Sequence, residues 1–437
     1  MDTTELLARW STMSLEEIEA ELQAGKDQAS AEQLLGSDQV NEIQEVETRR
    51  APAGPREAVV LLPGLMGSLL TSIRGVTSLL WINPLLILEG KSNYLELNRD
   101  GTSDGSPMVH AAPLSLEKMT YLKMAVALRR ECLLFEFPYD WRLRIETNAE
   151  YLAAAIETWA DGDSSLQFTL VGHSMGGLVA RALVNGDRSR ARKRIKRVIT
   201  LGTPHFGASG AVSDIMLGNR MMAIASALND NNDMRRMLST FPSVFQLLPA
   251  PPDLFPRDRH YPVNFDVYDE QAWRMDSIRQ DYLDGGKRLH ELLAGDNHPV
   301  PTVQIAGCHL DTIIDVEREF DGTGRSKLNI IREKTGADSG DATVPLWSAR
   351  LPGADMYYVQ EIHRDLPKNK EVIDAVIDLI YGRIPDLPDT LPEPKGGFLG
   401  FRPVTGSPEM EAEKLRQRIE AGTATEEDLQ LLFFING

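Results

Sequence analysis

Cysteine is scarce in this sequence, which excludes a fold held together by disulfides. The 437 residues include two cysteines, Cys132 and Cys308, far apart in the chain, and such a pair does not make a disulfide framework. We expect both to be reduced core residues, as in a cytoplasmic protein. Residues 1–5 are acidic and lack the apolar core of a secretory signal. These absences predict a cytoplasmic protein, or one that binds the periphery of a membrane.

Long apolar runs are also lacking. The most apolar stretch, residues 79–88, is too short to span a bilayer and is interrupted by Asn83 and Pro84. Acidic residues outnumber basic ones by 64 to 46, which gives a net charge of −18. A surface of that charge repels nucleic acid and anionic membranes wherever no local patch overrides it. The composition therefore predicts no nucleic-acid partner.

Motifs for metals and cofactors are missing as well. The sequence contains neither a Walker-type phosphate loop nor Gly-x-Gly-x-x-Gly. Residues 229–233 are rich in Asn and Asp but lack the glycine and the distal glutamate of a calcium loop. The short segment His309-Leu310-Asp311 is too sparse for a zinc site. We therefore expect neither a metal nor a cofactor.

The pattern of apolar and breaker residues divides the chain into three parts. Residues 1–36 have helical periodicity, and residues 37–56 have the composition of a linker. Residues 385–408 are rich in proline and precede a predicted helical hairpin. We predict a helical extension and linker at 1–50, a central domain at 51–384, and a Pro-rich linker with a helical hairpin at 385–437.

Predicted strands and helices alternate within the central domain. This βαβ pattern predicts an α/β fold with a mostly parallel sheet that helices cover on both faces. Residues 205–300 contain no obvious strand, so we predict a cap or lid insertion there. Strands are expected at 58–62, 133–137, 197–201, 303–306, 357–360 and in the run before residue 172, with helices at 116–130, 148–159 and 370–381.

The clearest chemical motif is Gly172-His173-Ser174-Met175-Gly176, which follows a β-prone run and precedes a helix-prone run. This is the context of a nucleophile elbow, in which a serine sits on a strained strand-to-helix turn between small residues. The N-terminus of the following helix favours developing negative charge. Ser174 is therefore the predicted nucleophile.

A serine nucleophile needs a base, and the base needs a carboxylate that orients it. In α/β-hydrolases these groups follow the serine in the order acid, then histidine. His363 follows the last predicted strand and is the predicted base. Two carboxylates qualify as the acid: Asp341, in a tight Gly340-Asp341 turn, and Asp311, which follows the strand at 303–306 more closely. The turn favours Asp341, and Asp311 stays open.

Two backbone amides should stabilise the oxyanion of the reaction. One is expected at Met175, the residue after the nucleophile. The other is expected in the turn after the strand at 58–62, where Leu65 is the first choice and Met66 the second.

Further motifs surround these candidate residues. Together with the elbow they resemble the lecithin:cholesterol acyltransferase family of α/β-hydrolases, which includes lysosomal phospholipase A2 and phospholipid:diacylglycerol acyltransferases. The resemblance covers residues 57–383. The motifs are Leu62-Pro63-Gly64-Leu65-Met66-Gly67-Ser68, Pro138-Tyr139-Asp140-Trp141-Arg142, Leu201-Gly202-Thr203-Pro204 and Gly340-Asp341-Ala342-Thr343-Val344-Pro345.

The resemblance implies a fold, an activity and site residues. It implies an α/β-hydrolase that cleaves or transfers acyl chains of glycerophospholipids. By analogy it supports Ser174, Asp341 and His363 as the triad, with Leu65 and Met175 as oxyanion donors. The chain departs from the family in lacking a secretion signal and extracellular disulfides, so it is similar to an intracellular relative of bacterial type.

Two apolar stretches suit a lipid substrate. The segment Trp81-Ile82-Asn83-Pro84 looks like part of the lid of this family, which predicts a lid insertion around 73–115. The second stretch, residues 241–249, lies in the predicted cap. A lid of this kind covers an acyl pocket when closed and meets lipid when open. Packing on the hydrolase core is an equal alternative for the residues predicted to contact lipid, which are Trp81, Leu85, Phe245 and Leu247.

These observations predict a serine lipid acyl hydrolase or acyltransferase, phospholipase A-like, that works through an acyl-enzyme. Its partners would be an acyl ester or phospholipid and, transiently, a membrane. Two alternatives stay open. One is an effector whose terminal helical hairpins dock another protein or a second copy and so control the hydrolase. The other is an esterase for small esters.

Overall fold

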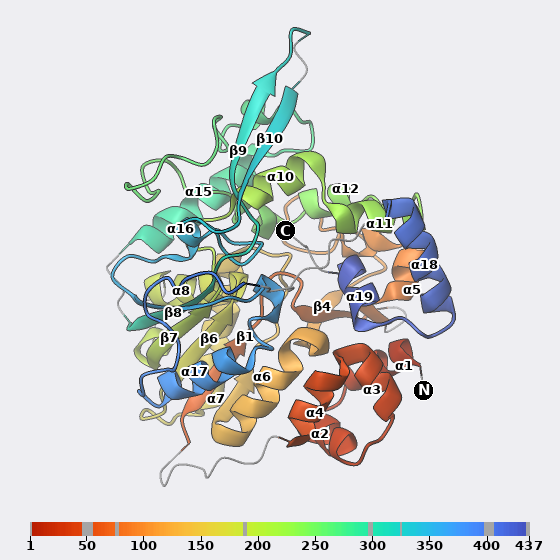
Figure 1. Cartoon of the computed structure of the whole chain (residues 1–437), viewed down its shortest axis with the longest axis vertical. Helices are drawn as coiled ribbons and strands as arrows, with labels where there is room; N and C mark the ends of the chain where they lie inside the picture. The colour runs from red at the N-terminus through yellow and green to blue at the C-terminus, as the bar shows by residue number, and fades with distance from the viewer. Residues whose placement is uncertain are drawn as a thin grey trace. The chain divides into compact units, whose positions relative to one another are not determined.

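The chain forms two compact units in the computed structural model (Figure 1). The structure describes residues 2–45, 56–74, 78–186, 190–295, 300–323, 326–396 and 406–433. Unit 1 comprises Met1–Asp140, Asn219–Thr240 and Pro403–Asn436, and unit 2 comprises Trp141–Gly218, Phe241–Arg402 and Gly437. The domain boundaries drawn from composition stay a prediction.

Unit 2 is built on parallel strands in the order β11-β8-β7-β6. Strands β6 and β8 are buried along their whole length, as expected of parallel strands that are covered on both faces. A separate antiparallel pair, β9 and β10, forms a hairpin (Figure 1). The strands are β6 (Phe168–His173), β7 (Ile195–Leu201), β8 (Thr302–Gly307), β9 (Thr312–Phe320), β10 (Ser326–Glu333) and β11 (Asp355–Val359).

Helices of unit 2 pack on this sheet and on one another. Helix α8 contacts β6 and β7 and is flanked by α7 and α15, while α17 contacts β7. The helices are α7 (Ile145–Ala160), α8 (Met175–Gly186), α9 (Arg190–Lys193), α10 (Ser209–Leu217), α13 (Pro242–Phe245), α14 (Glu270–Trp273), α15 (Gln280–Ala294), α16 (Leu346–Ala349), η2 (His363–Asp365) and α17 (Lys370–Ile380).

The predicted cap has an apolar core of its own in unit 2. Phe245, Trp273 and Tyr282 lie in one buried cluster that also includes Ile313 and Val316 of β9. The described residues between 205 and 295 form helices and loops without a strand, as the sequence predicted. Part of this insertion, Asn219–Thr240, belongs to unit 1 instead.

Unit 1 contains two sets of strands. Strand β1 pairs in parallel with β5, and β2 pairs antiparallel with both β3 and β4. The strands are β1 (Ala58–Leu62), β2 (Ser68–Ser72), β3 (Ser78–Trp81), β4 (Ala111–Leu116) and β5 (Leu133–Glu136).

The helices from the two ends of the chain pack together in unit 1 (Figure 1). Helix α19 packs on α3 and α11, and α18 packs on α11. The Thr3 hydroxyl donates to the Ala424 carbonyl at 2.9 Å. The helices are α1 (Thr3–Trp10), α2 (Leu15–Gln23), α3 (Gln28–Leu35), α4 (Ser37–Glu45), α5 (Pro84–Leu88), η1 (Ser92–Leu95), α6 (Lys118–Glu131), α11 (Arg220–Leu228), α12 (Met234–Ser239), α18 (Pro408–Glu420) and α19 (Glu426–Phe433).

The apolar C-terminal helix is buried within unit 1. Leu432 and Phe433 are fully buried, and the Phe433 ring meets the Trp81 ring edge-on at 5.1 Å. The apolar side chains at the end of this helix are therefore covered by this chain as far as Phe433. Docking of a partner through the terminal hairpins stays a prediction.

Two parts of the secondary structure differ from the sequence-based prediction. The linker assigned to residues 37–56 was wrong for Ser37–Glu45, which form helix α4. Its apolar contacts come from Val40 and Ile43, three positions apart, and its other residues are all polar, with Gln39 buried among them. Residues 46–55 lie outside the described part. The sheet β2-β3-β4 and the hairpin β9-β10 were also missed.

The parallel strands, the covering helices, the cap and the helical extensions confirm the predicted α/β-hydrolase fold class. None of the helices described here is both long enough and apolar enough to cross a bilayer. In the same described ranges, no cluster of three or more His, Cys, Asp or Glu side chains could hold a metal ion.

A buried histidine of unit 2 should make stability depend on pH. His290 of α15 is bonded to the Leu248 carbonyl at 2.9 Å, and burial lowers its pKa from 6.5 to about 4. On acidification the unfolded chain takes up this proton first, so the stabilisation is present above pH 6.5 and is lost as the pH falls toward 4. Protonation of His290 alone should lower the free energy of unfolding by about 3 kcal/mol over this pH range.

Denaturant unfolding at a series of pH values measures this loss. His290→Gln keeps a donor for the Leu248 carbonyl. We expect this variant to lose less unfolding free energy on acidification than wild type, by that amount. The exposed His110, 3.8 Å from Asp104, provides the control, and His110→Gln should change the unfolding free energy less than His290→Gln does. His173 contributes with the same sign, since burial lowers its pKa too, so some slope remains. Equal slopes for wild type and His290→Gln would contradict this assignment.

Candidate active site

Ser174 lies on a sharp turn between β6 and α8. Its backbone is left-handed, with φ of 54°, and its amide donates to the Leu201 carbonyl at 2.8 Å. A Cβ at Gly172 would come within 2.6 Å of the Gly177 nitrogen, and one at Gly177 within 2.0 Å of the Thr203 hydroxyl. The turn therefore requires glycine at both positions. Ser174 itself stays partly exposed, as a nucleophile must.

The structure brings Ser174, His363 and Asp341 together within unit 2. The Ser174 hydroxyl lies 2.8 Å from Nε2 of His363, and Nδ1 of His363 lies 2.7 Å from Oδ2 of Asp341. The backbone amide of His363 also donates to the Asp341 carbonyl at 2.9 Å. With Nδ1 donating to the carboxylate, Nε2 is free to accept the serine proton.

The Asp341 carboxylate is held by its own turn. It is 1% exposed, and its Oδ1 accepts from the amides of Thr343 at 3.1 Å and Val344 at 2.7 Å. The Thr312 hydroxyl, at the start of β9, accepts from the amides on both sides of Asp341. Because these donors fix one carboxylate oxygen and the peptide, the other oxygen points to His363.

Asp311 lies elsewhere. Its carboxylate is exposed and pairs with Arg332 at 3.1 Å, across the β9-β10 hairpin. The neighbouring Asp315 is buried, but it bonds Arg259 and His260, each at 3.0 Å. Of these carboxylates, the structure brings Asp341 to His363.

Two glycines allow the acid and the base to approach each other. A Cβ at Gly202 would lie 2.9 Å from Asp341 Oδ2 and 3.0 Å from His363 Nδ1. A Cβ at Gly307 would lie 2.5 Å from the Asp341 Cβ. Any side chain at either position would push the pair apart.

The electrostatic surroundings keep other groups neutral. His173 packs on His363 with ring centroids 4.9 Å apart and bonds the His363 carbonyl at 2.9 Å. Burial, together with the His363 charge, lowers the pKa of His173 well below its usual value. Burial, and then the Asp341 charge, raises the pKa of the Cys308 thiol to about 12. Cys308 is therefore a packing residue rather than a competing nucleophile.

The Met175 amide is suitably placed for an anion. Met175 is the first residue of α8, so its N–H has no partner within the helix. In the described part of the chain no other protein group accepts from it. The helix N-terminus adds a favourable potential for negative charge at this end.

Leu65 lies in unit 1, in the turn after β1. Three aromatic side chains bond the backbone around it: Tyr121 accepts from the Gly64 amide at 2.8 Å, Tyr139 donates to the Pro63 carbonyl at 2.7 Å, and Trp81 donates to the Met66 carbonyl at 2.9 Å. Among the residues described, the Leu65 amide has no acceptor. The turn is therefore fixed while this amide stays available, and its role as an oxyanion donor stays a prediction.

The residues expected at the lid differ in exposure. Trp81 and Phe245 are fully buried, Leu247 is partly buried, and Leu85 is 48% exposed. Trp81 packs on Phe433, and Phe245 packs on Tyr282 at 5.5 Å. Their contact with lipid stays a prediction.

Sequence reasoning missed the residues that hold the candidate groups in place. Thr312, Thr203, Tyr121 and Tyr139 act on backbone atoms, through contacts between positions far apart in the chain. The family motifs contained Thr203 and Tyr139 and could have pointed to them. For Thr312 and Tyr121 no sequence signal was available.

The fold and the site geometry define a protein of the α/β-hydrolase class with a serine on its elbow. Residues 115–281 match the family model described as lecithin:cholesterol acyltransferase. These residues include the elbow and the first part of the cap. Over these residues the chain is similar to the lecithin:cholesterol acyltransferase family, which agrees with the resemblance predicted from its motifs.

One curated relative is the protein named lecithin-cholesterol acyltransferase-like 4 from Arabidopsis thaliana. It is 25% identical over 125 residues, which is 27% of this chain and 23% of the relative. The match thus spans about a quarter of that protein's length.

Two solved structures are similar over longer stretches. The structure of the Tle4-Tli4 complex covers 74% of this chain and 98% of its own, with 14% identity and a TM-score of 0.48. The mature form of the Bacillus licheniformis lipase BlEst2 covers 76% of this chain and 94% of its own, with 16% identity and a TM-score of 0.39. Both likenesses are distant, so the fold assignment rests on the strands and helices themselves.

The contrast between the two aspartates gives a direct test of the site. We expect Asp341→Asn to lower kcat for an ester substrate by about 10³–10⁴-fold, because the amide cannot orient His363 in the required tautomer. Asp311→Asn should leave kcat within about twofold, since the change is at the surface. Steady-state kinetics with a chromogenic ester measures both, and circular dichroism checks that both variants fold. An equal loss of kcat in the two variants would contradict a role for Asp341 in orienting His363.

Proposed function

We propose that the protein is a serine-dependent acyl hydrolase or acyltransferase that acts on lipid esters. The observation that carries this proposal is the relay from Ser174 through His363 to Asp341, with hydrogen bonds of 2.8 and 2.7 Å. A partly exposed serine at the end of such a relay can attack an ester carbonyl. The family match at residues 115–281 supports an acyl-transfer reaction.

The first half of the reaction forms an acyl-enzyme. His363 Nε2 takes the proton as Ser174 Oγ bonds to the carbonyl carbon, and Asp341 stabilises the resulting imidazolium. The amides of Met175 and Leu65 would stabilise the oxyanion of the tetrahedral intermediate. Collapse of the intermediate expels the alcohol, which takes its proton from His363.

The second half releases the acyl chain. His363 now takes a proton from water or from an acceptor alcohol, whose oxygen attacks the acyl carbon. The bond between that carbon and Ser174 Oγ then breaks, and His363 returns the proton to Ser174. Water yields a free fatty acid, and an alcohol yields a new ester. The phospholipid substrate is proposed from the family match and from apolar residues such as Leu85, which is half exposed.

A small-ester esterase is the second candidate, and one observation favours it. Trp81 and Phe245 are both fully buried and pack on neighbouring rings, as core residues do. Higher turnover of short-chain esters than of phospholipid vesicles would favour this candidate over a lipase.

Replacement of the nucleophile tests the proposed mechanism. We expect Ser174→Ala to abolish labelling by a fluorophosphonate probe and to lower ester turnover by about 10⁴–10⁶-fold. Ser277→Ala, at an exposed serine, is the control and should behave as wild type. The products from mixed phospholipid vesicles, measured by mass spectrometry, separate lysolipid and fatty acid from a new ester. Labelling of Ser174→Ala at the wild-type rate would refute the mechanism.

The Trp81 hydrogen bond should matter for catalysis as well as for stability. Trp81→Phe keeps a ring against Phe433 but loses the donor to the Met66 carbonyl, so the turn bearing Leu65 loosens. We expect kcat to fall about tenfold, less than the roughly 10²–10³-fold that complete loss of one oxyanion donor typically costs, with little change in KM.

Trp273 offers a matched control for this variant. Its indole donates to the Val267 carbonyl at 3.0 Å in the cap, and it is equally buried. Trp273→Phe should cost similar stability, about 1 kcal/mol, and leave kcat unchanged. If both variants lower kcat alike, the Trp81 bond has no special role at the turn.

A further inference from the structure

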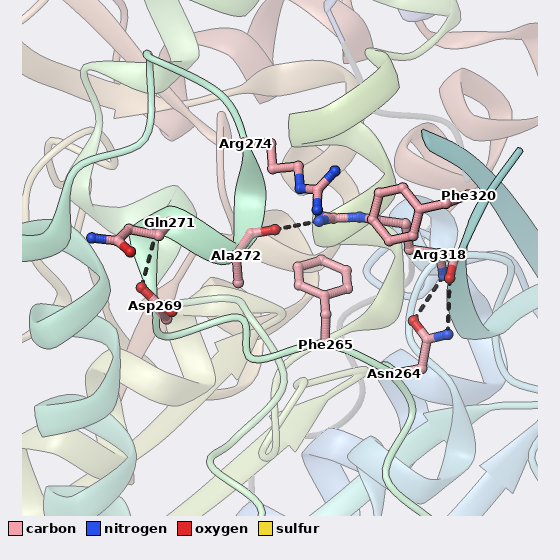
Figure 2. Close-up of a pocket in the computed structure, with 8 residues that line it drawn as sticks. All are labelled: Asn264, Phe265, Asp269, Gln271, Ala272, Arg274, Arg318 and Phe320. Carbon is pink, nitrogen blue, oxygen red and sulfur yellow. Dashed lines mark hydrogen bonds between the residues drawn. The ribbon is translucent and has the colours of Figure 1, made fainter. Parts of the chain in front are cut away.

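A pocket lies in unit 2, and none of Ser174, Asp341 and His363 lines it. It has a volume of about 330 Å³ and lies between the end of β9, helix α14 and the loop that precedes α14 (Figure 2). A pocket of this size is at the lower end of the range for small-molecule sites. Its lining residues are Asn264, Phe265, Asp269, Gln271, Ala272, Arg274, Arg318 and Phe320.

Arg318 is buried in the wall of this pocket. Its side chain and backbone are 7% exposed, and its guanidinium lies over the Phe265 ring, with Cζ 3.8 Å from the centroid. One terminal nitrogen donates to the Ala272 carbonyl and the other to Met216 Sδ at 3.5 Å. Among the described residues, Nε has no acceptor. The backbone of Arg318 is fixed by two hydrogen bonds to the Asn264 amide, at 2.8 and 3.1 Å.

Arg274 supplies a second positive charge to the same pocket. It ends helix α14 in a left-handed conformation, with φ of 54°, and its Cζ lies 4.3 Å from the Phe320 centroid. Figure 2 shows its guanidinium directed toward that of Arg318. Burial, and then the Arg274 charge, lowers the pKa of Arg318, so the two like charges interact unfavourably.

Neither arginine has a counterion among the residues that the structure describes. Within the described ranges no carboxylate lies at ion-pair distance from Arg274 or from Arg318. Asp269 also lines the pocket, but it caps α14, accepting from the Gln271 amide at 3.0 Å. The chain has a net charge of −18. Two neighbouring arginines without a carboxylate partner therefore make a positive patch on a mainly negative protein.

We propose that Arg274 and Arg318 form a binding site for an oxyanion of the phosphate class. Guanidinium groups bind phosphate oxygens through paired, charge-assisted hydrogen bonds. A phosphate between the two heads would offset their mutual repulsion and give the buried Arg318 charge a partner. The rings of Phe265 and Phe320 border this position and would pack on the organic part of a phosphate ester. The site does not depend on the role of Ser174.

The ligand's source is either a soluble phosphate ester or the headgroup of a phospholipid at a membrane. Both present the same group, and the experiment separates them. Soluble binding is measured by calorimetry with inorganic phosphate and glycerol phosphate. Membrane binding is measured by flotation with phosphatidylglycerol vesicles, on the Ser174→Ala protein so that any turnover cannot alter the lipid.

We expect Arg274→Gln to weaken phosphate binding by about tenfold or more, because a charged hydrogen-bond partner is lost. Arg274 is exposed and lacks an ion pair, so this variant should fold even if Arg318→Gln does not. Arg279→Gln is the matched control: Arg279 also lies over a ring, Tyr282 at 4.3 Å, but pairs with Asp281 at 2.6 Å. It should bind as wild type.

The outcomes separate as follows. If wild type binds glycerol phosphate but not vesicles, and Arg274→Gln loses this binding, the ligand is a soluble phosphate ester. If wild type floats with vesicles, this binding weakens as ionic strength rises, and Arg274→Gln does not float, the ligand is a phospholipid headgroup. The proposal is overturned if wild type binds none of these probes at millimolar concentration, or if Arg274→Gln and Arg279→Gln bind as well as wild type.

Discussion

The contact between Asp341 and His363 depends on the absence of side chains around it. Gly202 and Gly307 each leave space that a single Cβ would fill, and Thr312 ties down the peptide on both sides of Asp341. The relay is thus set by the backbones of β7, β8 and the start of β9. The hydrogen bonds from Ser174 through His363 to Asp341 form only because these strands bring the three groups together.

Much of the fold could be predicted from the sequence, because apolar periodicity marks buried strands well. The strand at Ala58–Leu62 was predicted to the residue, and β7, β8 and β11 to within two residues. The hairpin β9-β10 was missed because the charged residues Glu317, Arg318 and Glu319 interrupt the apolar pattern of β9, and because β10 has no buried residue. Helix α4 was missed because its apolar contacts reduce to Val40 and Ile43.

The candidate site was predictable only in part. Elbow spacing and chain order pointed to Ser174 and His363, while the acid stayed open between Asp341 and Asp311. Proximity along the chain favoured Asp311, but β9 begins at once and carries that side chain to the surface, where it meets Arg332. The pocket around Arg274 and Arg318 had no sequence signal, because it joins a helix end and a strand end more than forty residues apart.

Unit 1 is built from segments that lie far apart in the sequence, and this has a consequence for its synthesis. Its first 140 residues are completed by helices α18 and α19 near the opposite end, and Trp81 gains the Phe433 ring from the latter. A ribosome makes the N-terminal part first, so the relay residues of unit 2 emerge before the support for the Leu65 turn is complete. The nascent chain would therefore contain Ser174, Asp341 and His363 before Phe433 can pack on Trp81, which bonds that turn.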